Sequence, residues 1–103
     1  MIALIENKKA ELLNLCKKFH VSKLSVFGSI VSGTLKQDSD IDFLVSFEDG
    51  LDPIVRGQYY WDLIDSFEKL FQRKIDLVVE SSMKNKFFID EVNQTKQQLY
   101  VAA

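Results

Sequence analysis

The stretch of sequence that decides the fold is LSVFGSIVSGTLKQDSDIDFLVSF, residues 24–47. It starts with a short apolar run, Leu24 to Phe27, that Gly28 closes, which predicts a strand followed by a turn. It ends with the mostly β-branched and aromatic run from Ile41 to Phe47, which predicts a second strand. Residues 28–38 contain two glycines and several hydroxyl side chains, and this composition indicates a turn with a short helical piece.

Helices are expected on both sides of this stretch. Apolar side chains at helical spacing predict a first amphipathic helix that ends near His20, with the residues Ile5, Leu12, Cys16 and Phe19. After the stretch a helix is expected to begin at Pro53, because proline suits a first helical turn. Trp61 is expected in the core, and Tyr59 outside it on a possible partner surface. The predicted apolar stripe of this helix comprises Ile54, Tyr60, Trp61, Ile64, Phe67 and Phe71.

A third strand, Ile75 to Val79, and a last helix complete the predicted order of elements. Ser81 and Ser82 are candidate caps of this helix, which is expected to run nearly to the C-terminus on the apolar residues Phe88, Val92 and Leu99. The order helix, strand, strand, helix, strand, helix predicts an α/β (α+β) fold in which helices flank a small mixed sheet. Residues 1–103 are expected to form one domain.

Three aspartates stand on the strands that follow Gly28. Asp40 and Asp42 are two residues apart at the start of the second strand, so both point to the face opposite Ile41. Asp76 repeats the arrangement on the third strand. An acid between core-forming residues is unfavourable unless something compensates its charge. If the two strands are neighbours, all three carboxylates converge.

Converging carboxylates indicate a metal site. Two of them about 4 Å apart repel by on the order of 4 kcal/mol at an effective dielectric near 20. A divalent cation turns this repulsion into binding, and oxygen ligands select a hard ion such as Mg²⁺, which is commonly shared with substrate phosphates. Two such ions suit an in-line displacement at phosphorus.

Gly28 and Ser29 form a candidate phosphate site. A glycine directly after a strand lets the backbone approach a phosphate closely, and the following N–H groups and the Ser29 hydroxyl can donate to its oxygens. A Gly-Ser pair after a strand is by itself weak evidence for a phosphate site. It becomes specific together with Ser39-Asp40-Ile41-Asp42 and with a later strand that carries Asp76.

Two simpler interpretations explain less of the pattern. The D-x-D-x-D spacing from Asp38 to Asp42 fits the start of an EF-hand calcium loop, but such a loop needs glycine at its sixth position, where the chain has Phe43. An exposed acidic turn would explain the first two aspartates. It would explain neither Asp42 within an apolar run nor Asp76.

Composition narrows the remaining classes of function. The net charge is −2 with both signs interspersed, unlike the dense basic surface of a protein that binds nucleic acid directly. The single cysteine, Cys16, excludes an internal disulfide and is expected to be buried and inert. The single histidine, His20, excludes a Ser-His-Asp triad and is expected at a helix end without a chemical role. Membrane-span and signal-peptide patterns are missing, so a cytoplasmic protein is expected.

These motifs resemble those of the minimal nucleotidyltransferases, small prokaryotic members of the polymerase-beta-like superfamily. The resemblance covers most of the chain and includes the stretch Arg73-Lys74-Ile75-Asp76-Leu77-Val78. It implies the nucleotidyltransferase fold and the transfer of AMP from ATP to a hydroxyl, with release of pyrophosphate. It implies that two Mg²⁺ ions are held by Asp40, Asp42 and Asp76, and that Asp76 lies beside the acceptor hydroxyl. The nucleotide-binding residues that it implies are Gly28, Ser29 and Ser39.

The chain differs from the sequence pattern of this family in one place. Many relatives carry an arginine directly before the second glycine of the Gly-Ser element, where this chain has Ser32 before Gly33. Lys36 and Arg56 are the candidates to supply the missing positive charge.

The resemblance also implies a partner, a HEPN-type ribonuclease toxin. Little of the chain is left for an acceptor-binding domain, so acceptor recognition is expected from another protein. The leading hypothesis is an antitoxin that adenylylates a tyrosine of this toxin. The main alternative is an antitoxin that masks its partner without catalysis, and a third hypothesis is transfer to a small molecule such as an aminoglycoside.

Overall fold

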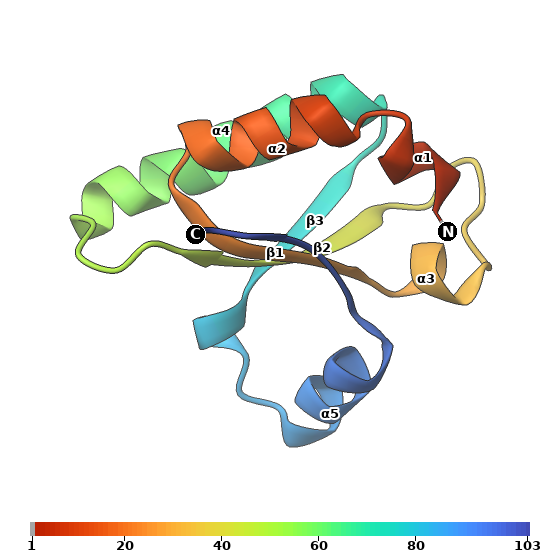
Figure 1. Cartoon of the computed structure of the whole chain (residues 1–103). Coiled ribbons are helices and arrows are strands. Elements are labelled where there is room, and N and C mark those ends of the chain that lie inside the picture. Colours follow the sequence, from red (N-terminus) through yellow and green to blue (C-terminus); the bar gives the residue numbers. More distant parts are fainter. Residues whose placement is uncertain (1) are drawn as a thin grey trace.

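In the computed structural model, which describes residues 2–103, a four-stranded sheet has helices on both faces (Figure 1). The helices are α1 (Ala3–Glu6), α2 (Lys9–Lys18), α3 (Ser29–Ser32), α4 (Pro53–Phe71) and α5 (Lys86–Thr95), with a 3₁₀ turn η1 (Glu80–Ser82). The strands are β1 (Val21–Phe27), β2 (Ile41–Phe47), β3 (Ile75–Val79) and β4 (Gln97–Val101).

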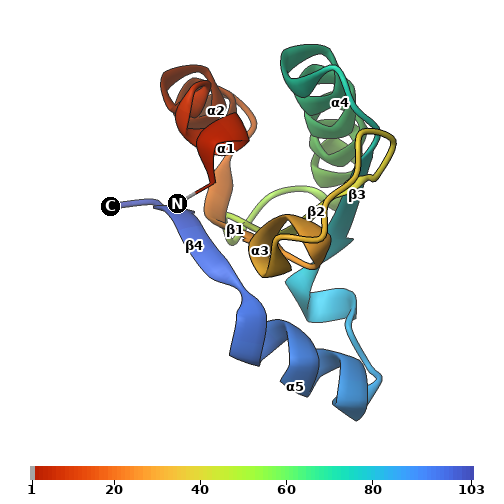
Figure 2. The same cartoon turned by 90° about the vertical axis from the view of Figure 1, so that its right-hand side faces the viewer.

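The sheet is mixed, and its strand order is β3-β2-β1-β4. β1 is antiparallel to both of its neighbours, whereas β2 and β3 are parallel and α4 makes the crossover between them. Figure 2 shows α2 and α4 side by side on one face of the sheet and α5 on the other. The predicted mixed sheet with flanking helices is therefore confirmed, and β2 and β3 have the predicted bounds.

Alternation along β2 gives the two faces of the sheet different roles. Ile41, Phe43 and Val45 are buried in the main core, which lies between the sheet and the helices α2 and α4. Asp42 and Leu44 therefore point to the face that carries α5. A second, smaller core on that face consists of Phe27, Leu44 and Val92. This smaller core fixes α5 to the sheet and leaves part of the face open.

The C-terminal segment differs from the predicted long helix. α5 ends at Thr95, and Leu99 lies on β4. β4 pairs with the free edge of β1, which satisfies the backbone N–H and C=O groups along that edge. The half-buried side chains of Leu99 and Tyr100 also pack against the main core. Strand pairing therefore outweighs the helical spacing of the apolar residues here.

The start of α5 also differs from the prediction. Ser81 and Ser82 belong to η1, and the residue that caps the helix is Asn85. Its Oδ1 accepts hydrogen bonds from the backbone N–H groups of Phe87 and Phe88 at 3.0 and 3.2 Å. Asparagine is a strong N-cap residue, and its position sets the first turn of the helix.

The prediction for Trp61 is wrong, because this side chain is 68% exposed. α4 turns Leu63 and Phe67 toward the sheet, and Trp61, two residues before Leu63, is rotated from it by about 200° around the helix axis. Trp61 instead packs edge-on against half-buried Tyr60, with ring centroids 5.3 Å apart. Ile54, predicted in the same stripe, is also exposed.

The N-terminal helix is observed as two pieces, α1 and α2, that are separated by a turn at residues 7–8. His20 follows α2, as expected, and its ring stacks on half-buried Tyr59 at 5.2 Å. Cys16 is buried, which raises the pKa of its thiol to about 12 and keeps it in the unreactive protonated form.

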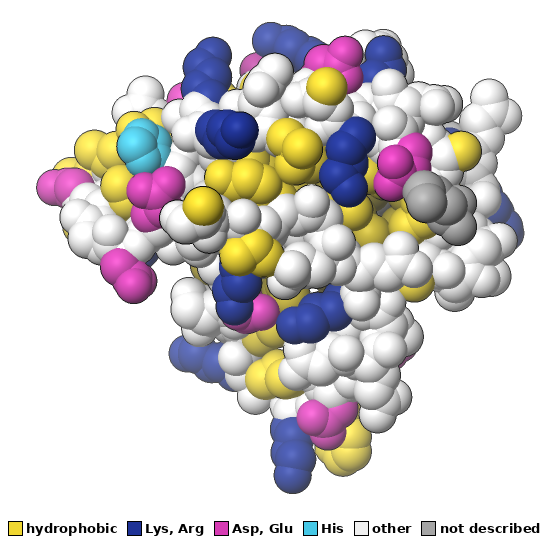
Figure 3. Space-filling model, in the orientation of Figure 1, with side chains coloured by type: hydrophobic (Ala, Val, Ile, Leu, Met, Phe, Trp, Pro, Cys, Tyr) yellow, Lys and Arg dark blue, Asp and Glu magenta, His cyan; other side chains and the backbone are white. Residues whose placement is uncertain are grey.

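Acidic and basic side chains are interspersed on the face of the molecule that Figure 3 shows. The side chains of Lys23 and Lys96 both pair with that of Glu80, at 3.6 and 3.7 Å. Of the helices described between residues 2 and 103, none combines the length and the apolar character needed to cross a membrane.

Candidate active site

Asp42 and Asp76 lie next to each other on neighbouring strands. β2 and β3 are parallel, and their register pairs Asp42 with Asp76 and Leu44 with Val78. Because these pairs alternate with core residues, both carboxylates are on the α5 face of the sheet. Asp40 lies two residues before Asp42, in the exposed segment that enters β2. The register thus brings together carboxylates that are 34 residues apart in the sequence.

The negative charges of Asp76 and Asp40 both act on the carboxyl of Asp42. Its side chain is half-buried, and the pKa of this carboxyl is raised to about 6. Burial is the largest cause, followed by the negative charges of Asp76 and Asp40. A group of acids that repel one another in this way is stabilised by a cation.

The arrangement of the carboxylates fits a cation that keeps some of its own water. Among residues 2–103, no group of three or more His, Cys, Asp or Glu side chains is arranged to hold a metal ion, so a cation at Asp42 and Asp76 would need further ligands from water or a substrate. Asp40 and Asp76 are exposed, and all three candidate ligands offer only oxygen atoms. Mg²⁺ prefers such a set, because it takes one or two carboxylates and completes its octahedron with water and substrate phosphates.

Gly28 lies directly against Asp42. It ends β1 with φ of 77°, a conformation that side chains rarely adopt. A Cβ atom on residue 28 would overlap Oδ2 of Asp42 and lie 3.2 Å from its Cγ. The glycine is therefore required both by the backbone angle and by the carboxylate beside it. The same absence of a side chain opens the backbone to a phosphate.

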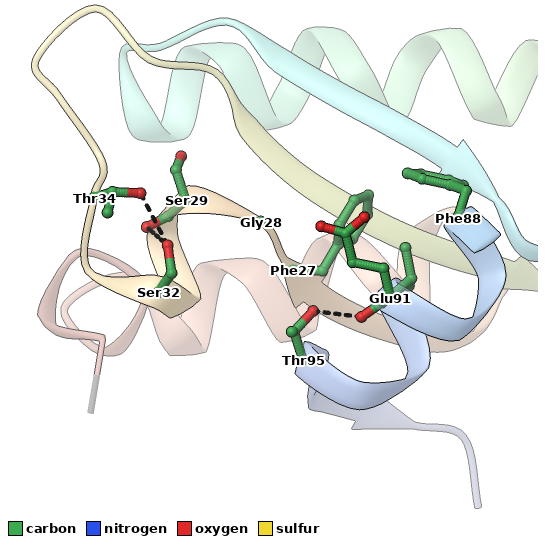
Figure 4. A pocket seen from close by; sticks show the side chains of 9 residues that line it. Phe27, Gly28, Ser29, Ser32, Thr34, Phe88, Glu91 and Thr95 are labelled. Atoms are coloured by element: carbon green, nitrogen blue, oxygen red, sulfur yellow. Dashed lines mark hydrogen bonds between the residues drawn. The ribbon is translucent and has the colours of Figure 1, made fainter.

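Hydroxyl groups cluster after Gly28. Ser29 begins α3, and the Ser32 hydroxyl donates to the Ser29 carbonyl at 3.3 Å. Ser32 and Thr34 also share a hydrogen bond between their hydroxyls at 2.9 Å (Figure 4). The position at which many relatives have arginine is thus occupied by a neutral pair of hydroxyl groups.

Arg56 and Lys36, the candidates for the missing positive charge, differ in position. Arg56 lines a hollow with Phe47 and Val79, at the ends of β2 and β3 that lie away from Gly28. It is therefore badly placed to replace the arginine. Lys36 lies in the loop between α3 and β2, which is closer in the chain to both halves of the site.

Arg73 is the residue that the sequence did not reveal. Its Nη1 atom donates to the carbonyl of Lys36 at 2.7 Å and to the carbonyl of Ser39 at 3.0 Å. Ser39, predicted to bind the nucleotide, accepts a hydrogen bond from the backbone N–H of Lys36 at 3.0 Å with its hydroxyl. Arg73 therefore holds the loop that leads into Asp40. Its place three residues before Asp76 is the only signal of this role in the sequence.

Tyr60 fixes α4 to the strand that carries Asp76. Its hydroxyl donates to the carbonyl of Leu77 at 2.8 Å. Burial, and then the charge of Asp76, raise the pKa of Tyr60.

Comparison with known proteins agrees with the fold. The family described as nucleotidyltransferase domain matches residues 9–98. A curated relative, protein adenylyltransferase MntA of Thermococcus cleftensis, is 39% identical over 69 residues, which are 67% of this chain and 66% of the length of that relative. The chain belongs to the nucleotidyltransferase domain family, and its resemblance to the minimal members is confirmed.

Two solved structures have the same fold. A toxin–antitoxin structure with AMP-PNP is 25% identical, with a TM-score of 0.70 over 91% of this chain and 73% of the other. A structure from Shewanella oneidensis, a tri-AMPylated HEPN toxin in complex with an MNT antitoxin, is 26% identical, with a TM-score of 0.60 over 99% of this chain and 74% of the other.

Proposed function

We propose that this chain is a magnesium-dependent protein adenylyltransferase that transfers AMP from ATP to a tyrosine hydroxyl of a HEPN-type toxin and so acts as its antitoxin. The observation that carries the proposal is the pairing of Asp42 with Asp76 directly beside Gly28. The relatives support the nucleotide and the acceptor: one is named a protein adenylyltransferase, one was solved with AMP-PNP, and one accompanies an AMPylated HEPN toxin.

In the proposed reaction, the tyrosine oxygen forms a bond to the α-phosphorus of ATP. The bond from the α-phosphorus to the oxygen that bridges to the β-phosphate breaks, pyrophosphate leaves, and the hydroxyl proton passes to solvent. Bound magnesium supplies charge neutralisation at the phosphates of this reaction.

The chain's own residues divide the remaining work. Asp40, Asp42 and Asp76 would hold the cations, and Asp76 would lie beside the acceptor hydroxyl. Gly28 gives the triphosphate access to the backbone, and the Ser29 hydroxyl donates to its oxygens. Ser39 contributes to nucleotide binding from the loop between α3 and β2, whose position Arg73 fixes by its hydrogen bond to the Ser39 carbonyl.

The test is transfer of label from α-labelled ATP to the purified HEPN partner in the presence of Mg²⁺. Wild-type protein is expected to label the toxin with α-labelled but not with γ-labelled ATP, which distinguishes nucleotidyl transfer from a kinase. Asp42→Asn is expected to reduce the rate at least a hundredfold, since it removes a charge from the metal site. Asp65→Asn is the matched control, because Asp65 is an exposed residue that pairs with Lys69 on the outside of α4.

Two results would contradict the proposal. Unchanged transfer by the Asp42→Asn variant would exclude the metal site. Neutralisation of the toxin without transfer, by wild-type protein and variant alike, would establish the masking antitoxin instead.

A further inference from the structure

A hollow of about 370 Å³ lies between the start of α3 and one side of α5 (Figure 4). This volume is in the range of small-molecule sites. Gly28 and Ser29 line one wall, so the hollow begins where the phosphates are proposed to bind. Phe88, Glu91 and Thr95 line the other wall, at positions three and four residues apart that share one face of α5. The hollow therefore continues the proposed active site toward α5.

The α5 wall offers an aromatic ring to the hollow. Phe88 packs edge-on against buried Phe27, with ring centroids 5.9 Å apart and an angle of 77° between the rings. Phe88 remains 38% exposed, so part of the ring is accessible. The flat π-systems of nucleobases stack on such rings.

Glu91 places a carboxylate in the same space. Figure 4 shows its side chain extending from α5 toward Phe27. Within residues 2–103 no salt bridge involves Glu91. An unpaired carboxylate repels phosphates and accepts hydrogen bonds from N–H groups. The charge of Glu91 therefore directs the phosphates toward Gly28 and favours a neutral group with donors beside α5.

We propose that this hollow binds the adenosine half of ATP, with the adenine ring on Phe88 and its 6-amino group donating to Glu91. The proposal rests on the proposed function, because ATP is the nucleotide that function requires. It assigns nucleotide selection to α5, an element outside the motifs that define the family resemblance.

The test measures binding by calorimetry with Mg²⁺ for three ligands that share the same triphosphate. They are ATP, 2′-deoxy-ATP, and the triphosphate of purine riboside, which is ATP without its 6-amino group. Wild-type protein is expected to bind ATP about tenfold more tightly than the purine riboside triphosphate. Glu91→Ala is expected to bring this ratio close to one, and 2′-deoxy-ATP is expected to bind as ATP does. Because each ratio is taken within one protein, general damage by the substitution cancels.

Phe88→Ala is expected to weaken ATP binding about tenfold. Phe88→Leu retains an apolar contact with Phe27 but loses the stacking face, so it is expected to weaken binding while keeping the melting temperature near that of wild type. The matched controls are Phe87→Ala and Asp90→Asn on the same helix. Phe87 is 86% exposed, and neither residue lines the hollow.

The outcomes separate this proposal from the proposed function. If wild-type protein binds and transfers normally while the Phe88 and Glu91 variants match it, the hollow is not the adenosine site, and the proposed function stands. A preference that depends on the 2′-hydroxyl instead of the 6-amino group would also overturn the assignment of Glu91. If wild-type protein binds no nucleoside triphosphate, the proposed function itself fails.

Discussion

Asp42 is a residue at which activity and stability oppose each other. It is half-buried, it lies against Gly28, and its register partner is another aspartate. Its burial and the charge of Asp76 both raise the free energy of the charged carboxylate in the folded chain. The proposed reaction nevertheless needs that charge to hold a cation. The repulsion among the carboxylates of the metal-free protein is thus a consequence of the proposed function.

This repulsion predicts a pH-dependent loss of stability. The pKa of Asp42 is about 6 in the folded protein and about 4 in an unfolded chain, so between these values the folded state binds the extra proton. The contribution to stability is therefore favourable below about pH 4 and is lost as the pH rises to 6. With EDTA present, Asp42→Asn is expected to raise the free energy of unfolding at pH 7.5 by about 1 kcal/mol, a value reduced for solvent screening.

Urea denaturation of wild type and variant at pH 4.5 and 7.5 measures the effect. The difference between the two proteins is expected to be larger at pH 7.5, and added Mg²⁺ is expected to narrow it by stabilising only the wild type. A variant that is less stable than wild type at pH 7.5 would show that Asp42 makes a favourable structural contact instead.

At the scale of elements, the loop between α3 and β2 needs an external support. Its carbonyls at Lys36 and Ser39 both accept from Arg73, and its own hydrogen bonds are few and exposed. The backbone N–H of Ile41 donates to the carbonyl of Lys74 at 3.1 Å, which joins the end of the same loop to the start of β3. The segment before β3 thereby sets the position of Asp40 relative to Asp76.

Arg73→Ala removes both hydrogen bonds to the loop, and it is expected to leave the fold intact and to raise the Mg²⁺ concentration for half-maximal transfer about tenfold or more. The rate at saturating Mg²⁺ is expected to recover, because Arg73 positions the loop and touches no reacting atom. Arg73→Lys should restore part of the Mg²⁺ affinity.

Lys74→Ala is the control for Arg73, since it removes a neighbouring exposed basic side chain and keeps the backbone bond to Ile41. An Arg73→Ala variant with an unchanged Mg²⁺ requirement would limit Arg73 to a structural role.

Helices and strands were predictable from the sequence where a local pattern of residue types determined them. β2 and β3 are composed of β-branched and aromatic residues around an aspartate, and both were predicted with the observed bounds. β4 was missed because Leu99 fits helical spacing as well as strand pairing, and the deciding partner, β1, is about 75 residues earlier in the chain. The exposure of Trp61 depends on the rotation of α4, which sequence spacing fixes only approximately.

The same limit applies to the candidate site. Asp42, Asp76 and Gly28 were found because strand alternation and a strand-ending glycine are local signals. The roles of Arg73 and Glu91 depend on contacts across the fold, so neither was assigned from the sequence.

At the scale of the whole molecule, the sheet separates stability from chemistry. Its α2/α4 face carries the large core, in which Leu63 and Phe67 are fully buried. Its α5 face carries the aspartates, the hollow and a core of only three buried residues. A substitution on the α2/α4 face is therefore expected to change stability but not ligand binding, and a substitution at the hollow on the α5 face is expected to do the reverse.

Leu63→Ala tests this separation. It leaves a cavity on the α2/α4 face and is expected to lower the free energy of unfolding by about 2–5 kcal/mol. The affinity of the folded protein for ATP should stay within about twofold of wild type, because Leu63 and the hollow lie on opposite faces of the sheet. Phe88→Ala should show the reverse, a small loss of stability and a large loss of affinity. Urea denaturation and calorimetry on both variants measure the two properties. If Leu63→Ala weakened ATP binding as much as Phe88→Ala, the sheet would transmit strain between its faces, and α5 would be held by the main core as well as by its own contacts.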